Sequence, residues 1–215
     1  LYDPYFHILG GAERYVLSIA ASLQKDYSVT IFTPSPVLLN KAMQKFGIDV
    51  SKFKSMPWPQ DKKSRNEILK TFDLFFYVTD GSLLLSPAKK NFLIIQTPDH
   101  IPKKNIINFI KLTSWQHVIC YSQFMADIIK NRLGRVPLTL FVPITMPPQV
   151  ATAKKRTIIS VGRFFSHLHN KKQLEMIEAF KKMISSGQKN ITLYLVGSVD
   201  PGGEEYYQKV KTASE

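Results

Sequence analysis

The stretch LGGAERYVLSIAASLQKDYSVTIFT, residues 9–33, contains the pattern that decides the fold. After the two glycines, apolar side chains recur from Tyr15 to Leu23 at the spacing of one helix face. Residues 27–33 are rich in β-branched and aromatic side chains, which is typical of a strand. Because a Gly-Gly turn that opens a helix normally follows a strand, we expect residues 1–2 to end one.

The same alternation of strand-like and helical segments continues along the chain and predicts an α/β protein with parallel sheets. Gly134 is expected to stop one helix and Asn170 to cap another, whereas residues 52–66 show no clear pattern. Further strands are expected at residues 74–79, 92–97, 118–121, 138–142, 157–161 and 191–196, and further helices at 38–46, 106–112, 123–133, 171–185 and from 204 onward.

The length of the chain and a proline-rich, polar stretch near residue 148 predict two domains. Its 215 residues exceed the usual size of one domain. Prolines 143, 147 and 148 are followed by a polar stretch. We therefore expect a first domain at 1–148 that lacks most of its opening strand, a linker at 149–156 and the start of a second domain at 157–215. Two strands and two helices are too few to cover a parallel sheet, so the second domain is expected to be incomplete.

The composition is that of a globular protein, with 44% hydrophobic and 12% aromatic residues. No apolar run approaches the ~20 residues that cross a bilayer, and no signal peptide opens the chain, so a cytoplasmic location is expected. The single cysteine, Cys120, lies in an apolar run and is expected to be a buried core thiol.

The chain is strongly basic, with 29 lysines and arginines against 16 acidic residues and a net charge of +13. Such a charge suits nucleic acid, an anionic membrane or a phosphorylated small molecule. Nucleic acid is disfavoured because the lysine pairs lack interleaved aromatic residues. Peripheral membrane contact is expected if Trp58, Trp115 or Phe109 is exposed on a basic face, although the tryptophans fit equally well as core or loop anchors.

Two turns have the composition of phosphate sites. At Gly10 and Gly11, the absence of side chains and the positive end of the helix dipole favour a bound anion. From these residues alone, a tight turn without a ligand is an equally good interpretation, and Glu13 would offset the same dipole.

The second turn follows the strand expected at 157–161. Arg163 stands just beyond its carboxyl end, where open α/β sheets bind ligands. Lys171 and Lys172 open the next helix, where the dipole disfavours cations unless an anion is bound. Arg163 and one lysine would neutralise a departing diphosphate, and the alternative is that the lysines are ordinary surface residues.

Several motifs together resemble the retaining GT-B glycosyltransferases known as family 4, or glycosyl transferase group 1. They are GGAER at 10–14, YSQF at 121–124, IISVGRF at 158–164, and Lys171 with EAF at 178–180. The resemblance implies GT-B architecture, in which two Rossmann-like domains with parallel sheets face one another, the second being truncated here. It also implies a nucleotide-diphosphate sugar donor, and neither a metal nor another cofactor.

The resemblance assigns roles to individual residues. Arg163 and Lys171 would be catalytic and would stabilise the leaving diphosphate, with Lys171 preferred to Lys172 for its spacing to the EAF motif. Gly10, Gly11 and Gly197 would complete donor binding, with the backbone of Gly11 near the donor phosphate or the acceptor. Transfer would occur on the same face of the sugar, to a glycan, a lipid-linked molecule or another hydroxyl acceptor.

The sequence also departs from the family pattern. Gln96 stands where many members carry a histidine near the transferred sugar, and His100 is either a substitute on the acceptor side or an exposed loop residue. His167 and His169 fit loop residues better than metal ligands.

The family's pair of glutamates, seven residues apart, is not found in this chain, and Glu204 and Glu205 do not replace it. These 215 residues alone are therefore expected to be inactive. The alternative function is a non-catalytic domain that binds sugar nucleotide or glycan.

Overall fold

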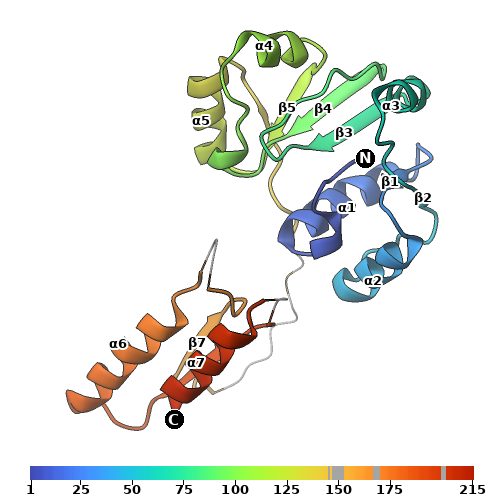
Figure 1. Cartoon of the computed structure of the whole chain (residues 1–215). Coiled ribbons are helices and arrows are strands. Elements are labelled where there is room, and N and C mark those ends of the chain that lie inside the picture. Colours follow the sequence, from blue (N-terminus) through green and yellow to red (C-terminus); the bar gives the residue numbers. More distant parts are fainter. Residues whose placement is uncertain (145, 147–152, 167–169, 200–201) are drawn as a thin grey trace. The chain divides into compact units, whose positions relative to one another are not determined.

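The computed structural model describes residues 1–144, 146, 153–166, 170–199 and 202–215. It is an α/β protein in which every pair of described strands is parallel. The chain divides into two compact units, Leu1–Met146 and Pro147–Glu215 (Figure 1). Residues 149–152 of the expected linker lie outside the described residues.

The first unit is organised around Tyr2. This residue bridges Phe32 on one side and Tyr77 on the other, both in parallel, and so joins a two-stranded and a four-stranded sheet. The resulting order is β2 (Lys54–Met56), β1 (Thr30–Phe32), Tyr2, β3 (Leu74–Val78), β4 (Lys90–Ile94), β5 (His117–Cys120) and β6 (Leu138–Thr139). Residues 1–2 are expected from the sequence to end a strand, and Tyr2 takes a strand position between β1 and β3 through these isolated bridges, outside the named strands. The strand order reverses beside Tyr2, and open α/β sheets bind ligands at such a switch point.

The helices of the first unit cover both faces of this sheet. They are α1 (Gly11–Leu23), α2 (Pro36–Phe46), α3 (Lys62–Leu69), α4 (Ile106–Leu112) and α5 (Gln123–Leu133), with the short 3-10 helices η1 (Phe6–Ile8) and η2 (Pro98–His100). Helices α1 and α2 contribute to one apolar cluster, and α3, α4 and α5 contribute to a second cluster on the opposite face.

Local chemistry explains where these helices begin and end. The hydroxyls of Ser35 and Ser122 accept backbone N–H groups at the starts of α2 and α5. Gly47 and Gly134 end the same helices in the left-handed conformation, which glycine adopts without strain. The prediction that Gly134 stops its helix is confirmed.

Both tryptophans belong to the core of the first unit. Trp115 is fully buried, and its indole N–H donates to the Leu84 carbonyl at 3.0 Å. Trp58 is half-buried and stacks on Tyr2, with ring centroids 3.7 Å apart. Of the two alternatives for Trp115, exposure or a core anchor, the structure shows the core anchor, because the ring packs against Phe75 and Tyr77 of β3. Only Phe109 of the three aromatic residues is exposed. Cys120 is buried, as predicted.

The second unit is a small α/β layer. Strands β7 (Thr157–Val161) and β8 (Thr192–Val196) pair in parallel over five residues each, and α6 (Gln173–Ser185) and α7 (Glu204–Ser214) pack against them. Its buried centre consists of Phe164, Ile177, Tyr206 and Val210.

Several boundaries expected from the sequence are wrong. Helix α6 begins at Gln173 and not at Lys171, because Lys172 is left-handed with φ of 61° and its N–H donates to the Asn170 side chain at 2.6 Å. Asn170 therefore holds the preceding turn and is not the N-cap. Residues 27–33 and 138–142 form only the short strands β1 and β6, whereas residues 52–66 include strand β2 and the start of α3.

Candidate functional site

The carboxyl ends of β7 and β8 approach each other unusually closely. A Cβ atom on Gly197 would lie 2.0 Å from the Gly162 carbonyl oxygen. The Gly162 N–H donates to the Val196 carbonyl at 2.8 Å, which holds the two chains in this position. Only glycine fits at 197, because the backbone of the turn that carries Arg163 lies directly against this position.

Lys171 packs over this turn. A Cβ atom on Gly162 would lie 2.7 Å from Lys171 Cγ, so the aliphatic stem of the lysine occupies the space that a side chain at 162 would need. Lys171 and Arg163 are both exposed. The structure thus brings together the stem of Lys171 and the turn of Arg163 at the edge where parallel sheets bind ligands.

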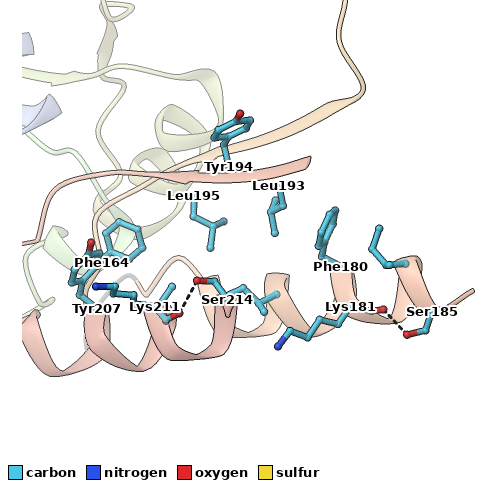
Figure 2. Close-up of a pocket in the computed structure, with 13 residues that line it drawn as sticks. Phe164, Phe180, Lys181, Ser185, Leu193, Tyr194, Leu195, Tyr207, Lys211 and Ser214 are labelled. Atoms are coloured by element: carbon cyan, nitrogen blue, oxygen red, sulfur yellow. Dashed lines mark hydrogen bonds between the residues drawn. The ribbon is translucent and has the colours of Figure 1, made fainter. Parts of the chain in front are cut away.

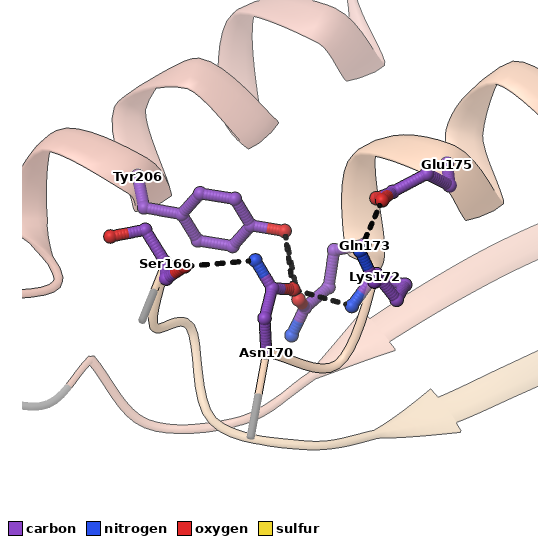
Figure 3. A network of polar contacts seen from close by, with 6 residues as sticks. All are labelled: Ser166, Asn170, Lys172, Gln173, Glu175 and Tyr206. Carbon is purple, nitrogen blue, oxygen red and sulfur yellow. Dashed lines mark hydrogen bonds and ion pairs between the residues drawn. The ribbon is translucent and has the colours of Figure 1, made fainter. Parts of the chain in front are cut away.

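A polar network connects this turn, Asn170 and Tyr206 to the start of α6 (Figure 3). Gln173 is 2% exposed, and its side-chain amide donates to the carbonyls of Arg163 at 2.9 Å and Gly162 at 3.4 Å. The Tyr206 hydroxyl lies 3.2 Å from Gln173 Oε1 and 3.3 Å from Asn170 Oδ1. The sequence analysis missed Gln173, although a polar residue on the apolar face of a helix was the available signal.

The two neighbouring lysines have different surroundings. The Lys172 ammonium forms an ion pair with Glu175 at 3.0 Å, and this pair lowers the pKa of the Glu175 carboxyl chiefly through its hydrogen bond. The stem of Lys171 instead lies against Gly162. Lys172 is therefore directed along the start of α6, and Lys171 is the lysine that lies on the turn.

The second unit also contains a hollow of about 670 Å³ between its helices and β8 (Figure 2). Its walls are mainly apolar and include Phe180, Leu193, Leu195 and Tyr207, with the lysine side chains of α6 and α7 on its helical side. Neither Arg163 nor Lys171 lines it. We interpret it as loose packing between the layers and not as an anion site.

In the first unit, the Gly-Gly turn lies at the start of α1. The Gly10 N–H donates to the Glu13 carboxylate, so one donor at this helix end has an internal partner. A Cβ atom on Gly11 would meet nothing within 4 Å, so packing does not require glycine there. The open space beside Gly11 would let a ligand approach the backbone.

Asp3 is a buried carboxyl at the same sheet edge, directly after the strand end at Tyr2. Its Oδ1 accepts the Tyr5 N–H at 2.8 Å, whereas Oδ2 has no partner among the described residues. Burial, with a contribution from the charge of Glu13, raises the pKa of Asp3 to about 7. The sequence analysis missed this residue, and its position just after a strand end was the available signal.

Gln96 and His100 follow strand β4, which β3 separates from Tyr2 in the sheet, and His100 ends the 3-10 helix η2. Gln96 is 7% exposed, and among the described residues its Nε2 has no hydrogen-bond partner. His100 is half-buried, stacks on Tyr5 with centroids 6.4 Å apart, and lies against the Gly81 backbone. The loop that holds Gln96 and His100 therefore packs against the segment that follows Asp3.

The sequence-predicted residues thus fall into two groups. Arg163, Lys171 and Gly197 share the edge of β7 and β8 in the second unit. Gly10, Gly11, Gln96 and His100 belong to the first unit. His167 and His169 lie outside the described residues.

Within the part of the chain that the structure describes, no three His, Cys, Asp or Glu side chains gather as a metal ion would need. In that same part, no helix combines the length and apolar character needed to cross a bilayer. No protein-family model matches the chain, and a comparison with curated proteins gave no match either.

Proposed function

We propose that the chain belongs to a retaining glycosyltransferase of GT-B architecture, which moves a sugar from a nucleotide-diphosphate donor to a hydroxyl acceptor. The observation that carries this proposal is the packing of Lys171 over Gly162 in the turn of Arg163. The chain also has two α/β units, and the strands within each unit are parallel. Each unit carries one of the motifs at the carboxyl end of a strand, which adds support.

The chemistry of sugar transfer explains the use of such a turn. As the bond between the anomeric carbon and the phosphate breaks, negative charge develops on the departing diphosphate. Arg163 and Lys171 would stabilise that charge from neighbouring positions, and the arginine can bind two phosphate oxygens at once. The new glycosidic bond forms on the same face, and the proton of the acceptor hydroxyl passes to a phosphate oxygen of the leaving group.

The first unit would serve the acceptor. Asp3, Gln96 and His100 follow strand ends at its carboxyl edge, and each has one buried side-chain oxygen or nitrogen atom without a hydrogen-bond partner among the described residues. Carboxylate oxygens accept hydrogen bonds from hydroxyls, and amide nitrogens donate to them. A glycan or the sugar of a lipid-linked acceptor presents such hydroxyls.

Calorimetric titration with UDP, GDP, ADP and their sugar conjugates tests the proposal. Arg163→Ala and Lys171→Ala should each weaken binding of the preferred nucleotide about 10- to 100-fold, because a hydrogen bond to a charged group contributes about 1.5–3 kcal/mol. Lys172→Ala is the matched control, since Lys172 is paired with Glu175. Lys172→Ala should change the affinity for the nucleotide less than about threefold, because an exposed ion pair contributes little energy.

Two outcomes would reject parts of the proposal. If Lys172→Ala weakens binding as much as Lys171→Ala, general basic charge and not the turn holds the nucleotide. The test of turnover uses the complete parent protein, because these 215 residues alone are expected to be inactive. If a nucleotide sugar binds at the turn but the parent protein, given its acceptor, releases no nucleoside diphosphate, the alternative of a non-catalytic sugar-nucleotide-binding domain replaces the enzyme.

A further inference from the structure

Helix α4 presents large apolar side chains to solvent. Ile106, Ile107, Phe109 and Ile110 are 53–72% exposed, whereas Leu112 is buried and anchors the helix to the core. Contiguous apolar surface of this kind marks a contact with another molecule or with a membrane. The helix therefore has one face in the protein and another without a partner among the described residues.

An apolar hollow lies beside this helix. Its volume is about 400 Å³, and its lining includes Leu83, Ile106, Phe109, Leu112 and Leu133. The exposed side chains of α4 thus continue into a cavity with mainly hydrocarbon walls. Such a site suits an acyl chain better than a polar ligand.

A basic depression adjoins the hollow. It has a volume of about 360 Å³, and its lining includes Lys103, Lys104 and Arg132. The two lysines also line the apolar hollow, so the two depressions share one rim. Residues 101–112 contain a third lysine, Lys111, and no acidic residue.

We propose that α4 and these two depressions form a docking surface for a bilayer that contains anionic phospholipids. Phe109 and the exposed isoleucines enter the acyl region, while Lys103, Lys104 and Arg132 contact lipid phosphates. Charge complementarity selects this partner, because a second copy docked through the same face would bring like charges together. The surface does not depend on the proposed glycosyl transfer.

Co-sedimentation with phosphatidylcholine vesicles, with and without phosphatidylglycerol, tests the docking surface. The two matched variants are Phe109→Ser and Phe124→Ser, since both phenylalanines are 68% exposed. Phe109→Ser should lower the partition coefficient about tenfold, because one buried phenylalanine ring is removed from the acyl region. Phe124→Ser should change it less than about twofold, and thermal melting verifies that both variants fold.

The charge requirement is tested with paired lysine variants. Lys103→Gln with Lys104→Gln should lower binding to anionic vesicles about 30-fold, whereas Lys62→Gln with Lys63→Gln on α3 should lower it less than about threefold. Equal binding to neutral and anionic vesicles, or equal effects of the two phenylalanine variants, would overturn the proposal. The proposal would also be overturned if the protein binds no vesicles and instead forms a dimer without lipid, and if Phe109→Ser dissociates that dimer.

Discussion

Asp3 makes the pH dependence of stability predictable. In the folded protein its pKa rises from the ordinary value of 3.8 to about 7, chiefly because burial disfavours the charged form. The folded state therefore binds the proton more tightly than the unfolded state does. Asp3 therefore contributes most to the free energy of unfolding below pH 3.8, where it is neutral in both states. This contribution falls as the pH rises to about 7, and above that value it stays constant at its lowest level.

Asp3→Asn removes this titration. The shift of about three pKa units corresponds to about 4 kcal/mol, since each unit is worth about 1.36 kcal/mol. The asparagine oxygen can still accept the Tyr5 N–H, and its buried NH₂ group carries a cost that does not vary with pH. The free energy of unfolding of the variant, relative to the parent, should therefore increase by about 4 kcal/mol between pH 4 and pH 8.

Urea unfolding of both proteins at several pH values between 4 and 8 measures this difference. At an m-value of about 2 kcal/mol per molar, the relative midpoint should move by about 2 M. Asp49→Asn is the matched control, because Asp49 also accepts a backbone N–H two residues on, at 2.9 Å, but is exposed. Its pKa is lowered by hydrogen bonds from Ser51, so its difference should be flat over this range. A flat difference for Asp3→Asn would refute the reasoning.

Two glycine substitutions should have opposite effects. Gly11→Ala places a methyl group in open space at the first helical position and should stabilise the first unit by about 0.5–1 kcal/mol in a thermal melt, while weakening any ligand that approaches this backbone. Gly197→Ala places a methyl group 2.0 Å from the Gly162 oxygen and should destabilise the second unit by about 3 kcal/mol. Faster hydrogen exchange in β7 and β8 would report this loss, and unchanged exchange would contradict the close approach.

The fold was predictable where one residue pattern decided it. Apolar spacing from Tyr15 to Leu23 is satisfied by one face of a helix, so α1 and its neighbouring strand followed from the sequence alone. Helix α3 escaped prediction because its sequence, KKSRNEIL, offers few apolar residues to define a face. Its position depends on the burial of Leu69 against the sheet, which no local pattern encodes.

The candidate site was predictable in its residue types but not in its surroundings. Arg163 follows a strand that the sequence indicates, so its location at a sheet edge could be expected. The burial of Asp3 depends on strands that are distant in sequence, namely β1 and β3 on either side of Tyr2. The start of α6 was not predictable, because the Asn170 side chain competes with the helix backbone for the Lys172 N–H. Asn170 accepts this N–H, and the helix therefore begins later, at Gln173.

In a chain with a net charge of +13, the charge of a lysine does not indicate its function. The residues and cavities around each lysine do distinguish one lysine pair from another. Lys62 and Lys63 are exposed in the first turn of α3 and line neither the apolar hollow nor the basic depression beside α4. Lys103 and Lys104 share the rim of an apolar hollow, so hydrocarbon and phosphate can be bound together there. Lys171 differs from its neighbour Lys172 because one stem lies on Gly162 and the other cation is paired with an acid. These three environments lead to three different expectations for chemically identical pairs, and the matched lysine variants separate them.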